Sequence, residues 1–415
     1  MAHDDVLADR AIPDVRPGGT LVLTMVALGH AVNHAYVALL PLLYPAIMAE
    51  LRFGYSQLGL LVAISRGVGQ GLQWLPGYLS RFIRRKTLMG VGTICQGIFY
   101  GLSGLANGFA TFLGCLTLNS LSGSPQHPNG NSLILDYFGK AHRGRVLAIH
   151  YAGGNAGAVL VPLVGALLLT TLGWRTTLLL FSLPGILIGL LMLWFIREEE
   201  DELRPVVVRE KPTFGRETVA ILKNRNVRWV MAAQATAAGG RGLGIVITFV
   251  PLYLSQGLGL TVVNTGVLFT LMMIGSVVGP MLAGFLSDRI GARKPILMTS
   301  YLASTFTTLL LVHLGAGGVW ILPVILFLLG TFVYSEAPML QSLAADSTEG
   351  VSPDVLFGIY YTFGFGASSL WAIIMGTLVD HFGFRPAFYV MAISYTVAAL
   401  WISRLRLPTR RGGTQ

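Results

Sequence analysis

The sequence predicts an all-α integral membrane protein with twelve transmembrane helices arranged as two parallel six-helix repeats. Three observations predict this fold class: an apolar composition, a series of apolar runs long enough to cross a bilayer, and an internal repeat. Of the 415 residues, 53% are hydrophobic and only 12% are charged. Soluble domains carry about 25% charged residues. The composition therefore excludes a soluble globular enzyme, a disordered chain and a disulfide scaffold.

Twelve apolar runs follow one another, each close to the ~20 residues that a helix needs to cross a membrane. They lie at about 20–48, 57–80, 87–106, 110–137, 145–171, 174–196, 229–254, 264–287, 295–314, 319–344, 355–379 and 384–403. The most polar stretch of the chain separates the sixth run from the seventh. We expect an N-tail (1–18), a first bundle (19–196), a linker (197–228), a second bundle (229–403) and a C-tail (404–415).

The positive charges predict the orientation, because Lys and Arg collect in the cytoplasmic loops of membrane proteins. With the N-terminus inside, 24 of the 29 Lys and Arg lie in cytoplasmic segments. The outer loops hold only Arg52, Arg175 and Arg385. The net charge of +10 is thus a sign of orientation and not of nucleic-acid binding. With no cleavable signal visible, we expect a multi-pass protein of the inner (cytoplasmic) membrane with both termini in the cytoplasm.

The two sets of six runs are related by an internal repeat. The segment Gly173-Trp174-Arg175 recurs as Gly383-Phe384-Arg385, an offset of 210 residues. The same offset relates Pro41 to Pro251, Pro128 to Pro338, Asp136 to Asp346, and Gly154 to Gly364. Parallel repeats of this kind are typical of secondary transporters, whose substrate site lies near the membrane midplane between the halves.

The loop after the eighth run reads Gly284-Phe285-Leu286-Ser287-Asp288-Arg289-Ile290-Gly291-Ala292-Arg293-Lys294. It resembles the signature loop of the major facilitator superfamily. The resemblance implies gating roles for Gly284, Asp288, Arg289, Gly291 and Arg293, and it implies no cofactor and no enzymatic activity.

The loop after the second run is a degraded copy of that signature. Gly77 and Arg85 match it, whereas Arg81 stands where the family has an Asp that latches the cytoplasmic side. A carboxylate suits the positive end of a helix dipole and an Arg does not. We therefore expect the N-terminal latch to be missing and Asp288 to serve the C-terminal half.

A narrower resemblance covers about 40 residues. His127-Pro128, Arg143-Gly144-Arg145 and Gly153-Gly154-Asn155-Ala156-Gly157 are similar to the fosmidomycin-resistance-type branch. That branch exports drugs against a proton gradient, so the resemblance implies a drug or metabolite exporter, an efflux antiporter.

Ionisable side chains inside membrane helices are costly and usually face a cavity or a partner. In the first run, His30 and His34 share a helix face beside Asn33, and we expect them to bind substrate or to shuttle protons. The second run carries Arg66 and Gln70 one turn apart. The alternatives are a neutral hydrogen-bonded histidine pair and a structural ion pair for the arginine.

Further substrate-binding candidates lie in the fourth, seventh and eleventh runs. Gln126 and His127 lie between Pro125 and Pro128, two prolines that weaken the helix. Gln234 precedes a glycine-rich stretch and Arg241 lies within it, and Tyr360 and Tyr361 lie in the eleventh run. Glycine at such density lets a helix break or another backbone approach. His150, near a cytoplasmic helix end, is expected at a gate or a wet surface.

Glu336 is the only acidic residue deep in an apolar run. A carboxyl group at depth can hold a proton at neutral pH, so we expect Glu336, with His30 and His34, to couple transport to protons. A permanent salt bridge to Arg241 or Arg66 is the alternative.

These residues predict a secondary active transporter for a small organic solute, working by alternating access as a monomer in the lipid bilayer. If Arg241 forms no salt bridge, the site is positively charged and favours uptake or exchange of an organic anion. If Glu336 pairs with Arg241, the site is near neutral and drug export is favoured. A transceptor or a membrane enzyme on the same scaffold is the remote alternative. No metal site, cofactor or nucleic-acid partner is expected.

Overall fold

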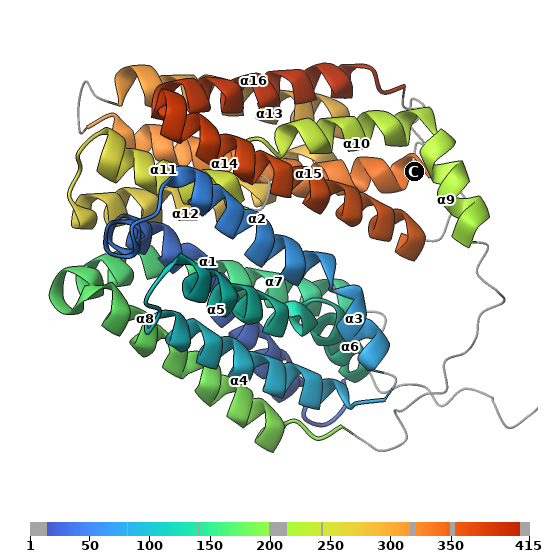
Figure 1. Ribbon diagram of the computed structural model, residues 1–415. Helices are drawn as coiled ribbons and strands as arrows, with labels where there is room; N and C mark the ends of the chain where they lie inside the picture. The colour runs from blue at the N-terminus through green and yellow to red at the C-terminus, as the bar shows by residue number, and fades with distance from the viewer. Residues whose placement is uncertain are drawn as a thin grey trace, which may run out of the picture.

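The computed structural model describes residues 15–80, 82–139, 142–198, 214–241, 244–315, 320–348 and 353–406. Helices form two groups, one from each half of the chain, which lie side by side (Figure 1). Within the described residues, seven helical segments are long and apolar enough to cross a membrane, and one of them, Arg145–Phe195, contains two predicted crossings. The other four predicted crossings lie on helices that are shorter, broken or less apolar.

The described residues of the N-terminal half form nine helical elements. They are α1 (Gly19–Leu51), α2 (Tyr55–Gly71), α3 (Trp74–Leu79), α4 (Arg85–Ser103), α5 (Phe109–Ser122), the 3-10 turn η1 (Ser124–Gln126), α6 (Pro128–Tyr137), α7 (Arg143–Val159) and α8 (Val161–Phe195). Proline explains one break, because it removes a backbone donor and clashes with the preceding turn. Pro125 and Pro128 lie where α5 gives way to η1 and α6, as their positions in the sequence predict.

The C-terminal half repeats the plan. Its elements are α9 (Phe214–Lys223), α10 (Arg225–Ala237), α11 (Ile245–Leu252), the π-helical η4 (Tyr253–Gly257), α12 (Val262–Ile290), α13 (Arg293–Leu314), α14 (Leu322–Asp346), α15 (Pro353–Phe382) and α16 (Phe384–Ser403). The helix that contains the seventh crossing begins at Arg225, inside the stretch expected to be linker. Asn224 caps it by accepting hydrogen bonds from the N–H groups of Asn226 and Val227.

The repeat in the sequence is also a repeat in the backbone conformation. Gly173 and Gly383, related by the offset, both have positive φ angles, 74° and 81°. Each lies at the tight turn between the last two crossings of its half. Glycine is the residue that adopts this conformation without strain, which explains why both copies of the repeat keep it.

The two halves meet at one end of the molecule. There the carboxylate of Asp380, in the last turn of α15, accepts hydrogen bonds from the N–H groups of Tyr55 and Ser56 at the start of α2. Gly59 packs on the backbone of Ala372, and Gly376 on that of Tyr55, so small residues let the two helices approach closely. We call this the closed end.

Toward the other end, α2 and α15 separate. A groove of about 510 Å³ opens between them at Gly67, Gly71 and Gly366. Contacts at that end involve residues near both limits of the described chain. The N–H of Arg16 donates to the carbonyl of Tyr137, and Nζ of Lys294 donates to the carbonyl of Leu405. We call this the linker end, since α9 lies there (Figure 1).

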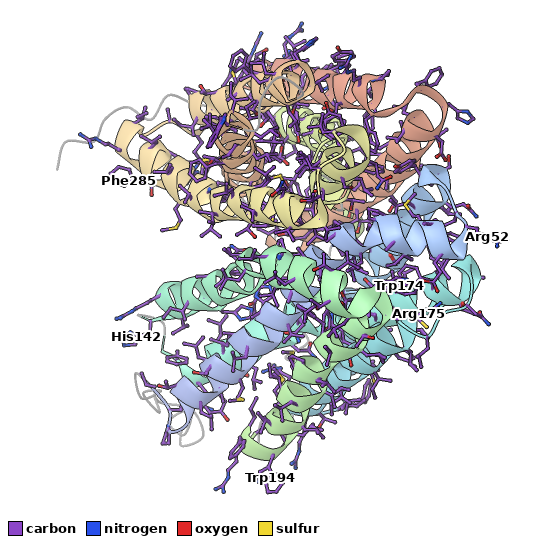
Figure 2. The ribbon with its side chains drawn as sticks, turned by 90° about the vertical axis from the view of Figure 1, so that its left-hand side faces the viewer. Arg52, His142, Trp174, Arg175, Trp194 and Phe285 are labelled. Atoms are coloured by element: carbon purple, nitrogen blue, oxygen red, sulfur yellow. The ribbon has the colours of Figure 1, made fainter. Side chains whose placement is uncertain are left out.

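The outer surface of the bundle is apolar. Trp194 is 82% exposed and Phe285 is 61% exposed, and both project from the periphery in Figure 2. Large exposed apolar side chains of this kind are expected where lipid replaces water as the solvent. Trp174 and Arg175 lie together in the same view, and Arg175 bonds to Glu50 of α1 near the closed end.

Candidate functional site

Arg241 lies in an unwound segment between α10 and α11. The helix ends at Ala237, turns through Gly239 and Gly240, and resumes at Ile245. A Cβ atom at Gly240 would overlap the ring of Tyr395. The glycine-rich stretch therefore does what the sequence predicts, since it both breaks the helix and admits a neighbour. Broken transmembrane helices are where transporters build their sites.

The guanidinium of Arg241 faces Glu336 of α14. Nη1 of Arg241 lies 3.7 Å from Oε1 of Glu336, with the two side chains 32% and 9% exposed. The Cζ atom of Arg241 also lies 5.3 Å from the centre of the Tyr334 ring, within the range of a cation–π contact. The pair is thus a loose one, with more of the cation than of the carboxylate accessible.

Tyrosines surround this pair. Tyr301 of α13 and Tyr360 of α15 are buried and lie within electrostatic range of both Glu336 and Arg241. Tyr361 is 38% exposed, and its ring lies 5.4 Å from that of Tyr360. The structure thus brings together four of the predicted residues, Arg241, Glu336, Tyr360 and Tyr361, which come from three different helices.

Arg66 reaches the same region from the other half. Its guanidinium contacts Gly244, which has a φ of +76°, so a side chain at that position would displace the arginine. Arg66 and Arg241 both lie within electrostatic range of Tyr334. One arginine from each half therefore flanks the point where the two bundles face one another.

Four histidines form a second cluster, within the N-terminal half. The ring centre of His30 lies 4.5 Å from that of His34, 5.0 Å from that of His127 and 4.4 Å from that of His150. The expectation of a wet surface for His150 is wrong, because its side chain is 0% exposed and stacks on His30. Gly154 of α7 packs directly on His30 of α1, and this close approach of the two helices buries the side chain of His150.

Tyr151 completes the histidine cluster and was not predicted. Its ring centre lies 5.8 Å from that of His30, and its hydroxyl accepts a hydrogen bond from Asn131. Electrostatic interactions connect Tyr151 with Tyr361 across the two halves. Tyrosine is common on helices of every kind, so its type alone carried no signal; Tyr301 and Tyr334 were missed for the same reason.

The remaining predicted binding residues make other contacts. Gln126 is buried and donates to Thr93 of α4, and Asn33 lies against Gly123. Gln234 packs on Gly364. Gln70 is half-buried in the last turn of α2. Their roles in binding stay predictions.

At the linker end, the signature loops make contacts inside each half. Arg85 forms an ion pair with Asp136, and Arg293 forms the equivalent pair with Asp346. Gly291 caps α12 with a φ of +70°. Asp288 and Arg289 are exposed, and neither side chain forms a hydrogen bond or ion pair with the residues that the structure describes. A Cβ at Gly77 or Gly284 would meet nothing within 4 Å. Arg81 lies outside the described residues.

Two duplicated helical bundles, a polar centre between them and a broken helix that carries a charged side chain define a secondary transporter of organic solutes. A sequence profile described as Major Facilitator Superfamily matches residues 26–268 and 240–415. The chain belongs to the major facilitator superfamily. This confirms the predicted fold of twelve transmembrane helices, and it confirms that the protein is not an enzyme.

Relatives in bacteria match most of the chain. The membrane sensor protein UhpC of Escherichia coli is 22% identical, covering 91% of this chain and 90% of its own. The hexuronate transporter of Bacillus subtilis is 23% identical over 93% and 94% of the two chains. The fosmidomycin resistance protein of E. coli is 22% identical over 89% of each.

Solved structures show the same fold. The D-xylose-proton symporter superposes with a TM-score of 0.75 at 18% identity, covering 95% of this chain and 99% of its own. A bacterial homologue of the human lysosomal transporter Spinster, in an inward-facing and unoccupied conformation, gives a TM-score of 0.68 at 18% identity over 93% and 95% of the chains.

Proposed function

We propose that this protein moves a small organic anion across the inner membrane by alternating access, coupled to protons. The observation that carries the proposal is the loose ion pair between Arg241 and Glu336 in the broken segment, 3.7 Å from nitrogen to oxygen. In this proposal the positive charge of Arg241 binds the anionic group of the substrate, and the carboxylate of Glu336 takes up the proton.

Arginine keeps its charge at any physiological pH and binds carboxylates and phosphates through two parallel hydrogen bonds. In the empty site its charge is balanced by Glu336, the pairing for which the residues alone favour drug export; because this contact is loose, at 3.7 Å, it does not keep the arginine from binding an anion. Since the guanidinium is the more exposed partner, an incoming anion can replace the carboxylate without passing through a tight contact. Arg66, against Gly244 on the facing half, adds a second positive charge that favours an anion.

Coupling follows from charge balance. When Glu336 takes up a proton it becomes neutral and releases Arg241, which then binds the anion. Anion and proton are thus carried together, and neither is favoured alone, because each would leave one charge of the buried pair unmatched. The mechanism predicts symport of an anion with a proton, with the direction set by the gradients.

The names of the relatives support an anionic substrate class. A hexuronate transporter acts on a sugar acid, and two chlamydial relatives are named as probable hexose phosphate transport proteins. The fosmidomycin resistance protein favours the second candidate, drug export by proton antiport. In that case the site would accept solutes without an anionic group.

Proteoliposomes with an imposed pH gradient test the proposal. Glu336→Gln is expected to abolish accumulation driven by the gradient and to keep exchange of labelled for unlabelled anion, because a glutamine mimics the protonated acid. Unchanged dependence on the gradient would sink proton coupling at Glu336. Asp346→Asn, an acidic residue of the same helix at the linker end, serves as the matched control.

The proposed orientation, with both termini in the cytoplasm, has its own test. A cysteine at Gly108, in a predicted outer loop, is expected to react with an impermeant reagent in intact cells. A cysteine at Gln415 is expected to react only after lysis. The reverse result would invert the topology.

A further inference from the structure

The histidine cluster has the composition of a ligand site. Its four imidazoles come from three helical elements: His30 and His34 from α1, His127 from the start of α6, and His150 from α7. All three neighbours lie within 5.0 Å of His30, measured between ring centres. Packing alone does not explain four polar rings in one place, because burying polar groups without hydrogen bonds is costly.

Several nitrogen atoms of the cluster are buried without hydrogen bonds. Among the described residues, Nε2 of His30 and both ring nitrogens of His150 have no partner. These two side chains are 1% and 0% exposed. Nδ1 of His30 lies 3.3 Å from the carbonyl oxygen of His150. Leaving a buried polar group unmatched is costly, so these atoms point to a ligand that accepts from them.

The surroundings contain no negative charge within the described part of the chain. The ion pairs found there join other residues, and the titratable group that the structure places against the histidines is Tyr151 of α7, beyond which Tyr361 lies across the interface. A first proton on the cluster therefore has no counter-charge, and a second would repel the first at this separation. An anion removes both obstacles.

We propose that this cluster is a proton-linked site for a tetrahedral oxyanion, the phosphate, phosphonate or sulfonate group of the transported solute. The proposal rests on the proposed anion transport and adds a second anion subsite to that of Arg241, so it specifies a solute that carries a tetrahedral acid group. A protonated imidazole donates from both nitrogens, and the hydroxyl of Tyr151, which accepts from Asn131, has its own proton to give. So many donors match the three or four oxygens of a tetrahedral group better than the two of a carboxylate.

Access to the site is from one side. His34 and His127 are half-buried and Tyr151 is 43% exposed, whereas His30 and His150 are fully buried, so a ligand would reach the cluster past the first three. Because protons and anion stabilise one another, each raises the affinity for the other by the same factor. Acid therefore strengthens binding of the anion, and binding of the anion draws in protons.

Sulfate is the probe, since it stays doubly charged between pH 5 and 8 and its own titration cannot imitate the effect. Binding of labelled sulfate to the purified protein in detergent is measured by equilibrium dialysis at about pH 5.5 and about pH 8, on either side of the histidine range. Binding about tenfold or more tighter in acid is expected, within the usual range of coupling between two sites. Equal binding at both pH values, or none, would overturn the proposal.

Variants assign the site. In the Glu336→Gln background, where protonation of Glu336 no longer contributes to binding at Arg241, His150→Gln and His34→Gln are each expected to remove the acid-dependent part of binding; His34 is half-buried, so its variant tests the site even if the buried one fails to fold. His313→Gln is the control, because His313 lies outside the cluster and contacts Tyr389. It should bind like the parent.

Two further variants separate this proposal from the proposed function. Glu336→Gln should keep acid-dependent sulfate binding even though gradient-driven transport is lost. If acid-dependent binding survives both histidine changes and disappears in Arg241→Gln, the anion binds at Arg241 and the cluster is not its site. If the histidine variants behave as expected while the proteoliposomes show no proton coupling, only the coupling mechanism fails.

Discussion

The carboxylate of Asp380 accepts a hydrogen bond of 2.6 Å from the backbone N–H of Ser56, so the last turn of α15 caps the first turn of α2 across the two halves. A second bond, 2.9 Å long, comes from the N–H of Tyr55. An acidic side chain at a helix N-terminus satisfies free N–H groups and balances the positive end of the dipole. The contact exists only while the closed end stays closed.

Asp380→Asn is expected to favour the state in which the closed end opens. Losing the charge at a helix N-terminus costs about 1 kcal/mol, which is about a fivefold change in the ratio of two states. Spin labels at Arg52→Cys and Arg385→Cys, on the two halves, should gain a longer distance in double electron–electron resonance. His381→Gln, the neighbouring residue, is the control, and an unchanged distance distribution in D380N would contradict the latch.

The paired contacts Arg85–Asp136 and Arg293–Asp346 are expected to contribute little to stability. Both pairs are partly exposed, with side chains between 26% and 43% accessible. Exposed ion pairs are worth about 0–1 kcal/mol. A double-mutant cycle with Arg85→Gln and Asp136→Asn, read from unfolding in detergent, should give a coupling energy in that range. A coupling energy of several kcal/mol would contradict the prediction, because it would require the ion pair to be shielded from solvent.

Gly157→Ala is expected to destabilise the N-terminal half. A Cβ at this position would overlap the backbone of Ala31, so α7 and α1 would have to move apart. Overpacking of this kind costs about 1–3 kcal/mol. Gly114→Ala, on α5 with nothing within 4 Å of its Cβ, is the matched control and should keep or raise the melting temperature, because alanine favours a helix more than glycine does. Equal melting temperatures for the two variants would contradict the tight packing of α1 against α7.

Arg241→Lys is expected to weaken the binding of anions while leaving that of neutral solutes unchanged. Lysine keeps the charge opposite Glu336 but cannot make the two parallel hydrogen bonds of a guanidinium. Losing one charge-assisted bond costs about 1.5–3 kcal/mol, or about ten- to hundredfold in affinity. Binding is measured by calorimetry with a sugar acid and its neutral parent sugar. Arg175→Lys, on the Glu50 pair, is the control, and equal losses for both ligands would favour the drug-export candidate.

The sequence by itself determined the fold and its repeat. A bilayer requires long apolar helices, and duplication leaves the same residues at the same offset, as at Gly173 and Gly383. It also located the helix breaks at Pro125 and Arg241, because proline and clustered glycine act through the local backbone. These features depend on chain composition and short-range geometry, which a sequence contains in full.

Only the tertiary structure decided which polar residues meet. Glu336 could have paired with Arg66 or Arg241, and the structure pairs it with Arg241 at 3.7 Å. His150 lies 120 residues from His30 and still stacks on it, because α7 packs against α1. Contacts between helices depend on how each one is rotated and where it crosses its neighbour, and spacing along a single helix does not contain that information.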